Sequence, residues 1–252
     1  MRLILLAVVF AVWLAAQSPS VVAVDPNFAQ IVSPTAKIEK LAGNMKFTEG
    51  PVWMGDHLLF TDIPNNAIMK WTPGGQLTAF RKPVFPGKYE EGQFVGANGL
   101  TLDKSGRLTS CEHSNRRVAR TEKDGKITVL ADKYEGKRLN TTNDLAIGRD
   151  GSVYFTDAVT QRLWHLNAEG KVLSRWETAN DLRAPSGIAL DRFENVFVAG
   201  ANGVGVFSNE GELLFMSNEG LSSAIALAFD KRNRLYVLSA KPARVLRFEV
   251  KY

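Results

Sequence analysis

The chain has 252 residues, of which 45% are hydrophobic and 23% are charged, an ordinary globular composition that excludes a disordered chain. Its length suits one large domain or two small ones. The single cysteine, Cys111, excludes an intramolecular disulfide framework and a cysteine-based metal cluster. The net charge of +5 is not gathered into runs, so we expect a mildly basic surface and no nucleic-acid partner.

Residues 1–23 have the features of a secretory signal. One positive charge at Arg2 precedes an apolar run from Leu3 to Ala16, and small residues follow it. Cleavage after Ala23 is the preferred interpretation, cleavage after Ala16 is an alternative, and an uncleaved N-terminal anchor is a third. The apolar run is short for a membrane span, so no membrane contact is expected beyond this segment. A secreted or periplasmic protein is predicted, with residues 24–36 as a linker.

From residue 37 to 252 the chain repeats one pattern of two short β-rich stretches joined by a turn containing Gly, Asn or Asp. A second hairpin follows each copy. The repeats begin near Glu49, Asn98, Asn143, Ser186 and Ala224. Four strands per unit at a spacing of about 40–45 residues is typical of a β-propeller, and the alternative of a β-sandwich explains the repetition less well. We therefore predict an all-β propeller with five readable blades.

The last repeat, which starts near Ala224, has room for only three strands before residue 252. The segment from Lys37 to Ala42 precedes the first blade, and we expect it to supply the fourth strand and so remove an open sheet edge. The interval from Lys82 to Val95 lengthens the first repeat and is predicted to be a loop over one face.

Propeller topology predicts which loops share a face. The connections that enter each innermost strand should gather around the axis, together with the loops that follow each second strand. The first group contains Glu49, Asn98, Asn143, Asp144 and Ser186, and the second contains Asp62, His113 and Asp157. Oxygen ligands of this kind suit a hard divalent cation such as Ca²⁺ or Mg²⁺.

Each candidate also has a simpler interpretation. Glu49 is either an inward-facing ligand or an exposed loop acid, and Asn98 is either a substrate contact or a turn residue that caps its loop. His113 lies on the expected channel face and is a candidate ligand contact, whereas His57 and His165 are expected at surface or strand positions. No serine-hydrolase elbow, zinc-protease motif or phosphate loop is present, which removes those classes.

These residues together resemble the senescence-marker-protein/gluconolactonase/luciferin-regenerating-enzyme-like family. The resemblance rests on five stretches in the same order: Phe47-Thr-Glu-Gly-Pro-Val-Trp, Ala97-Asn-Gly-Leu-Thr-Leu-Asp, Cys111-Glu-His-Ser-Asn-Arg-Arg-Val, Tyr134-Glu-Gly-Lys-Arg-Leu-Asn-Thr-Thr-Asn-Asp-Leu and Gly151-Ser-Val-Tyr-Phe-Thr-Asp. They are dense over residues 37–157 and looser beyond. The resemblance implies a propeller of usually six blades, an axial divalent cation that is often Ca²⁺, and hydrolysis of sugar lactones.

The resemblance assigns family roles to Glu49 and Asn143 but leaves two other positions of the family's site without a match. Glu49 matches the metal-ligating Glu, and Asn143 matches a substrate-side Asn that could also reach the metal. The blade that should bring a metal-binding Asn is missing, and Ser186 stands where the family has an Asp that is both ligand and base, so Ser186 would be a weak ligand. Asp144 is the expected substitute base, with Asp62 and Asp181 as alternatives.

Two functional hypotheses follow. The first is a lactonase-type hydrolase of a small sugar lactone, with a divalent cation (Ca²⁺, or Mg²⁺, Mn²⁺ or Zn²⁺) held by Glu49, Asn143 and weakly Ser186, with Asp144 as catalytic base, and with substrate contacts from Asn143, His113 and Asn98. The second is a catalytically degenerate propeller that binds a ligand or a protein. The missing blade and Ser186 favour the second hypothesis, and the intact Glu-Gly-Pro and Asn-Asp motifs favour the first.

Overall fold

The computed structural model describes residues 39–218, 221–241 and 243–250, and the segment from Asn44 onward forms the main compact unit. The predicted signal segment, the linker and the first two residues of the predicted closing strand therefore lie outside the described residues. The described residues form strands and no helices, so they contain no helix that could cross a membrane.

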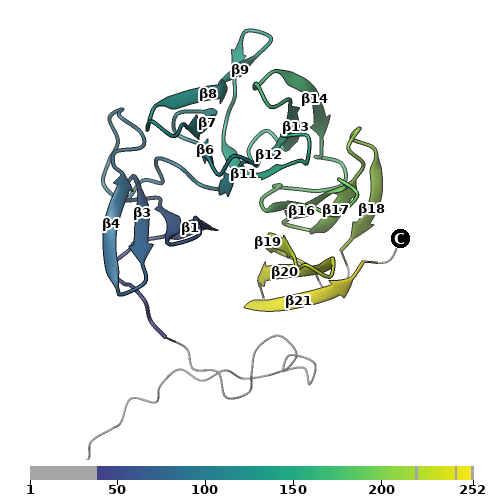
Figure 1. Cartoon of the computed structure of the whole chain (residues 1–252). Coiled ribbons are helices and arrows are strands. Elements are labelled where there is room, and N and C mark those ends of the chain that lie inside the picture. The colour runs from purple at the N-terminus through teal and green to yellow at the C-terminus, as the bar shows by residue number, and fades with distance from the viewer. Residues whose placement is uncertain (1–38, 219–220, 242, 251–252) are drawn as a thin grey trace, which may run out of the picture. The chain divides into compact units, whose positions relative to one another are not determined.

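The strands form the five blades predicted from the repeats (Figure 1). Four sheets have four antiparallel strands each: β1 (Thr48–Trp53) to β4 (Gln76–Arg81) through β2 (Leu58–Asp62) and β3 (Ala67–Thr72); β5 (Leu100–Leu102), β6 (Leu108–Glu112), β7 (Arg117–Thr121) and β8 (Ile127–Ala131); β11 (Thr142–Ile147), β12 (Val153–Asp157), β13 (Arg162–Leu166) and β14 (Val172–Glu177); and β15 (Ile188–Leu190), β16 (Val196–Gly200), β17 (Gly203–Phe207) and β18 (Leu213–Ser217).

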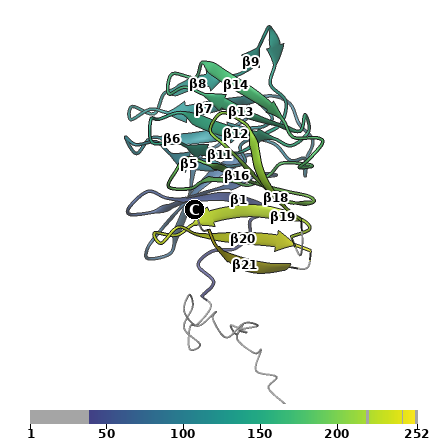
Figure 2. The same ribbon diagram turned by 90° about the vertical axis from the view of Figure 1, so that its right-hand side faces the viewer.

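The fifth blade has three strands among the described residues: β19 (Ala224–Phe229), β20 (Arg234–Ala240) and β21 (Ala243–Glu249). An extra hairpin, β9 (Lys133–Tyr134) with β10 (Lys137–Arg138), stands between the second and third blades. Figure 2 shows the three strands of the fifth blade side by side, with β21 as its outermost strand.

The closing strand predicted at Lys37–Ala42 is not found in its described part. Residues 39–43 are irregular, and Leu41 is 47% exposed rather than packed in a sheet. Asn44 then takes a left-handed conformation with φ of 67°, which interrupts an extended backbone just before β1. The interval from Lys82 to Val95 is free of strands, as predicted for a loop.

An aspartate begins three of the hairpin turns and helps to close them. Asp103 Oδ1 accepts hydrogen bonds from the backbone N–H groups of Ser105 (2.9 Å) and Arg107 (2.8 Å). Asp191 and Asp230 repeat this pattern two and four residues further along their own turns. An Asp side chain that accepts hydrogen bonds from backbone N–H groups later in the sequence favours a tight turn over a continued strand. This explains why Leu-Asp or Phe-Asp recurs at the end of the first strand in these repeats.

Apolar clusters between successive blades form the core. Leu59 and Ile68 of the first blade pack with Leu100 and Leu108 of the second. Three further clusters join the remaining neighbours, and the largest includes Phe155, which is fully buried between the second and third blades. The second strand of each of the first four blades is the most buried because it has neighbours on both sides within its sheet and on both faces. This packing fixes the loops of the innermost strands around the axis.

Candidate functional site

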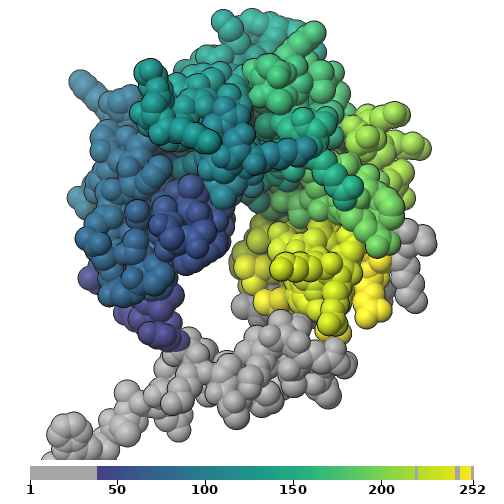
Figure 3. All heavy atoms as spheres, viewed as in Figure 1, coloured from purple at the N-terminus to yellow at the C-terminus, as the bar shows by residue number. Residues whose placement is uncertain are grey.

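The loops entering the innermost strands converge, as the topology predicted. The side-chain amide of Asn98 donates to the side-chain oxygen of Asn143, which joins the second blade to the third. The N–H of Gly99 also donates to the backbone oxygen of Asn143 at 2.8 Å. Figure 3 shows an opening between the first blade and the yellow fifth blade.

Two glycines allow this close approach of the loops. A Cβ at Gly50, which has φ of +53°, would lie 2.6 Å from the backbone oxygen of Asn98. A Cβ at Gly99 would lie 2.3 Å from Oδ1 of Asp144. Both distances are shorter than any real Cβ contact, so the motifs Glu49-Gly50 and Asn98-Gly99 need glycine at these positions.

Asp144 is the central acid of the cluster. Its Oδ1 accepts from the N–H of Leu145 at 2.9 Å, and its Oδ2 accepts from the N–H of Ile188 at 3.2 Å, so the carboxylate also joins the third blade to the fourth. Burial nevertheless raises the pKa of Asp144 from 3.8 to about 7, and the nearby charge of Glu49 acts in the same direction.

Glu49 lies close enough to interact electrostatically with Asp144. Burial raises the pKa of Glu49 above its ordinary value, and the hydrogen bond from the N–H of Gly50 at 3.3 Å only partly offsets this. Within the described residues, no lysine or arginine forms an ion pair with either acid. The two carboxylates therefore repel each other without a neutralising side chain.

Ser186 lies beside this cluster but is engaged by the backbone. Its hydroxyl lies 3.3 Å from the backbone oxygens of both Ala199 and Ala224, and it can donate its one hydrogen to either. Its own carbonyl accepts from Thr156 Oγ1 at 2.7 Å. A hydroxyl in this setting supplies a neutral oxygen and cannot replace a carboxylate as a base.

Thr156 is a contributor that the sequence reasoning did not single out. Its hydroxyl oxygen accepts from the N–H of Asp144 at 3.1 Å while its hydrogen goes to Ser186. The equivalent Thr61 of the first blade donates to the backbone oxygen of Glu49 at 3.0 Å. The repeated Phe-Thr-Asp at residues 60–62 and 155–157 was the available signal.

The second-strand acids expected near the channel mouth have other partners. Asp62 accepts from the N–H groups of Lys46 and Phe47, and Asp157 accepts from those of Asn140 and Thr160. Both carboxylates therefore cap loops. Asp181, the other alternative base, offers its backbone oxygen to Asn202.

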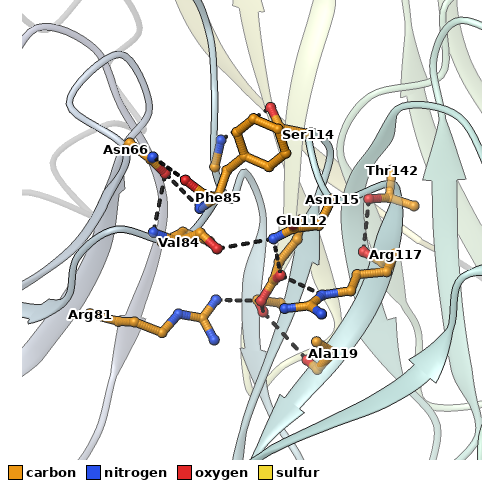
Figure 4. Close-up of polar contacts among 12 residues, drawn as sticks. Asn66, Arg81, Val84, Phe85, Glu112, Ser114, Asn115, Arg117, Ala119 and Thr142 are labelled. Carbon is orange, nitrogen blue, oxygen red and sulfur yellow. Dashed lines mark hydrogen bonds and ion pairs between the residues drawn. The ribbon is translucent and has the colours of Figure 1, made fainter. Parts of the chain in front are cut away.

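Glu112 occupies the matching position of the second blade. Its fully buried carboxylate lies between Arg81 and Arg117 and also accepts from Asn115 at 2.7 Å (Figure 4).

His113 contacts the long loop between the first two blades. Its Nε2 lies 2.9 Å from the backbone oxygen of Phe94, and burial lowers its pKa. Among the described residues, no hydrogen bond joins it to Glu49, Asn143 or Asp144.

Comparison with known proteins identifies the matching region. Residues 47–162, which hold Glu49, Asn98, Asn143 and Asp144, match the model of the SMP-30/Gluconolactonase/LRE-like region. The gluconolactonase of Zymomonas mobilis subsp. mobilis is 34% identical over 142 residues, which is 53% of this chain and 39% of that protein. The chain thus matches well under half the length of this family relative.

Solved structures share the fold beyond the family region. An X-ray structure of a protein proposed to be a gluconolactonase aligns with a TM-score of 0.70 at 24% identity, over 86% of this chain and 80% of that one. A catalytically inactive virginiamycin B lyase from Staphylococcus aureus aligns with a TM-score of 0.64 at 17% identity, over 79% and 66% of the two chains. At these identities the likeness establishes the propeller fold alone.

The side chains around Asp144 supply oxygen donors of the kind that bind hard divalent cations. The described residues contain no group of three His, Cys, Asp or Glu side chains arranged for a metal. The cluster does offer two carboxylates that lack a basic partner and the side-chain oxygen of Asn143. Mixed carboxylate and amide oxygens are the ligands of hard cations.

Proposed function

We propose that the chain hydrolyses a small sugar lactone at the cluster formed by Glu49, Asn98, Asn143 and Asp144, which we call the axial cluster. The observation that supports this most is the placement of all four residues, by their loops, at the innermost strands of the region that matches the gluconolactonase-like family model. A lactone is a neutral ring with a polarised carbonyl and several hydroxyls, which amide groups can orient by hydrogen bonds.

Asp144 is the group in this cluster that can accept a proton. Its pKa of about 7 lies near neutral pH, where a general base is most effective. In the proposed reaction a water oxygen bonds to the lactone carbonyl carbon and a water proton moves to a carboxylate oxygen of Asp144. The ring C–O bond then breaks, and the leaving ring oxygen takes that proton from Asp144 to become the hydroxyl of the hydroxy acid. Ser186 takes no proton in this scheme because its hydroxyl is bonded to backbone oxygens.

We further propose that Glu49 and Asn143 hold a divalent cation, with Ser186 as a weak additional ligand. When bound, such a cation would polarise the lactone carbonyl and offset the repulsion between the two carboxylates. Ca²⁺ fits this oxygen-rich set best, and Mg²⁺, Mn²⁺ and Zn²⁺ are the alternatives to test. Asn98 holds the side chain of Asn143 in place from the neighbouring blade.

The test is hydrolysis of a panel of aldonolactones followed by acid release, with EDTA and with each cation in turn. Asp144→Asn should lower kcat by about 100-fold or more, the size expected for loss of a general base. Glu49→Gln should weaken the dependence on the cation. Asp150→Asn, which changes an acid of a distant hairpin turn, should leave the rate unchanged. Rates no higher than spontaneous hydrolysis with every cation would refute the catalytic proposal.

A non-catalytic ligand-binding propeller is the second candidate. It is favoured by the serine at the position where the family resemblance places a carboxylate, and by the engagement of that serine with backbone oxygens. Saturable lactone binding by calorimetry, without turnover and with loss on Glu49→Gln, would support this candidate over the first.

A further inference from the structure

A cavity lies away from the axial cluster, between the β9–β10 hairpin and the outer strands of the third blade. Its volume is about 320 Å³, within the range of cavities that hold small ligands. Figure 1 shows the hairpin standing between β8 and β14 at the rim of the blades. We call this cavity the rim pocket.

The rim pocket is rich in positive charge. Lys137 and Arg138 come from β10, Arg162 from β13 and Arg175 from β14. Two of these cations share one acid, since the Nε atoms of Arg162 and Arg175 lie 2.8 and 3.5 Å from the same oxygen of Glu177. A single carboxylate cannot neutralise both guanidinium groups.

The acids that line the pocket do not remove this excess. Asp157 accepts backbone hydrogen bonds from Asn140 at 3.2 Å and Thr160 at 3.0 Å, so it serves the loop. Glu135 is exposed on the hairpin turn. The guanidinium of Arg138 donates to the backbone oxygen of Asn115 at 2.6 Å, a neutral acceptor.

One arginine of the pocket, Arg175, is held in place before any ligand arrives. The guanidinium carbon of Arg175 lies 5.5 Å from the ring centre of Tyr134 and 5.8 Å from that of Trp164. The two rings themselves meet edge to face at 5.4 Å. Cation–π contacts of this kind orient a guanidinium without using its N–H donors, which can then bind an anion.

Two buried polar atoms in the pocket wall lack partners. The side chain of Trp164 is buried, with 4% of the residue exposed, and its indole Nε1–H has no acceptor among the described residues. The hydroxyl of Thr160 is in the same situation. An unsatisfied buried polar group costs about 1–3 kcal/mol, so such groups usually mark a missing partner.

We propose that the rim pocket binds a small oxyanion, a carboxylate or phosphate group on a molecule no larger than a monosaccharide. Arg162 and Arg175 bind the anion's oxygens, Lys137 and Arg138 add charge from the hairpin side, and Trp164 and Thr160 donate hydrogen bonds to it. The proposal concerns a site separate from the axial cluster and does not depend on lactone hydrolysis. The carboxylate of a sugar acid and inorganic phosphate present the same oxygens, so both are tested.

Isothermal titration calorimetry of the full chain provides the test, in EDTA and at constant ionic strength. The probes are sodium gluconate and sodium phosphate, with sodium chloride and glucose as blanks. We expect one site per chain for at least one oxyanion, and the anion that binds identifies the source. Arg162→Gln and Arg175→Gln should each weaken binding by about 10-fold or more, equivalent to about 1.4 kcal/mol.

Matched variants distinguish binding in the rim pocket from binding elsewhere on the chain. Arg149→Gln removes an arginine that is also ion-paired, with Glu194 at 3.4 Å, but lies outside the pocket, and it should leave binding unchanged. Glu49→Gln should also have no effect, which separates the rim pocket from the axial cluster. Trp164→Phe keeps an aromatic ring and removes the N–H, and should weaken binding several-fold while the thermal melt stays cooperative. Absence of saturable heat above the chloride blank, or equal weakening by Arg149→Gln, would overturn the proposal.

Discussion

Replacing Asp144 with asparagine tests the electrostatics of the axial cluster independently of any activity. Asp144 has its pKa raised from 3.8 to about 7 by burial, with a further contribution from the charge of Glu49. A carboxyl group whose pKa is higher in the folded state holds its proton there at a pH where the unfolded chain has lost it. Its contribution therefore favours the folded state at low pH and is lost as the pH rises from about 4 to about 7.

The size of this effect follows from the two pKa values. The interval between 3.8 and about 7 corresponds to an upper limit of about 4 kcal/mol, at about 1.4 kcal/mol per pH unit. Because Asp144 retains partial exposure, solvent screens part of this, and we expect about 2 kcal/mol. Asparagine cannot ionise, so the variant lacks this dependence. It loses an acceptor for one of the two backbone N–H groups at every pH, which cancels when two pH values are compared.

The assay is urea unfolding of the wild type and Asp144→Asn in EDTA, at pH 4.5 and pH 8. The wild type should lose about 2 kcal/mol more than the variant between these values, or about 4–8 °C in Tm for a domain of this size. Asp150→Asn is the control, because hydrogen bonds with Ser152 lower the pKa of Asp150 below its ordinary 3.8. Asp150 is then ionised in the folded and unfolded chain at both pH values, so this variant should keep the pH dependence of the wild type. Parallel pH profiles for the wild type and Asp144→Asn would refute the assignment of a raised pKa.

Two further predictions concern buried groups of the second blade. Glu112→Ala removes the fully buried carboxylate between Arg81 and Arg117 and should lower the free energy of unfolding in urea by about 3–5 kcal/mol. The control Glu177→Ala, at a half-exposed position, should lower it by under about 1 kcal/mol. Equal losses in the two variants would contradict this account of Glu112. Burial raises the pKa of the Cys111 thiol and closes it to solvent, so a thiol reagent should modify it only when urea is added, and rapid reaction of the native chain would contradict its buried placement.

The blade repeats could be predicted from the sequence because their signals are local. Each turn carries an Asp, Asn or Gly at a fixed place, and each second strand is an apolar run such as Leu58–Asp62 or Val153–Asp157. Closure of the ring could not be predicted in the same way. A closing strand depends on contacts between distant parts of the chain, and the left-handed Asn44 that follows residues 39–43 has no such repeated signal.

The site was predictable as a neighbourhood and less so in its details. Propeller topology correctly brings Asn98, Asn143 and Asp144 together, because loops entering innermost strands must meet at the axis. The same rule also made Asp62 and Asp157 candidates for the channel mouth, but their carboxylates cap loops. The rule places a residue on a face and cannot say which groups its carboxylate binds. The rim pocket escaped notice because its arginines lie on separate strands, and residues far apart in the sequence, such as Trp164 and Arg175, become neighbours only through strand pairing.

The polar atoms of the axial cluster also form hydrogen bonds between neighbouring blades. The backbone oxygen of Asn143 receives a hydrogen bond from the second blade, and the carboxylate of Asp144 receives one from the fourth. In repeat architectures the contacts between neighbouring units determine how far unfolding spreads from one unit to the next. A change at either residue therefore alters the coupling between blades. If the proposed reaction takes place at this cluster, its specificity can change only as far as other contacts come to couple the three blades.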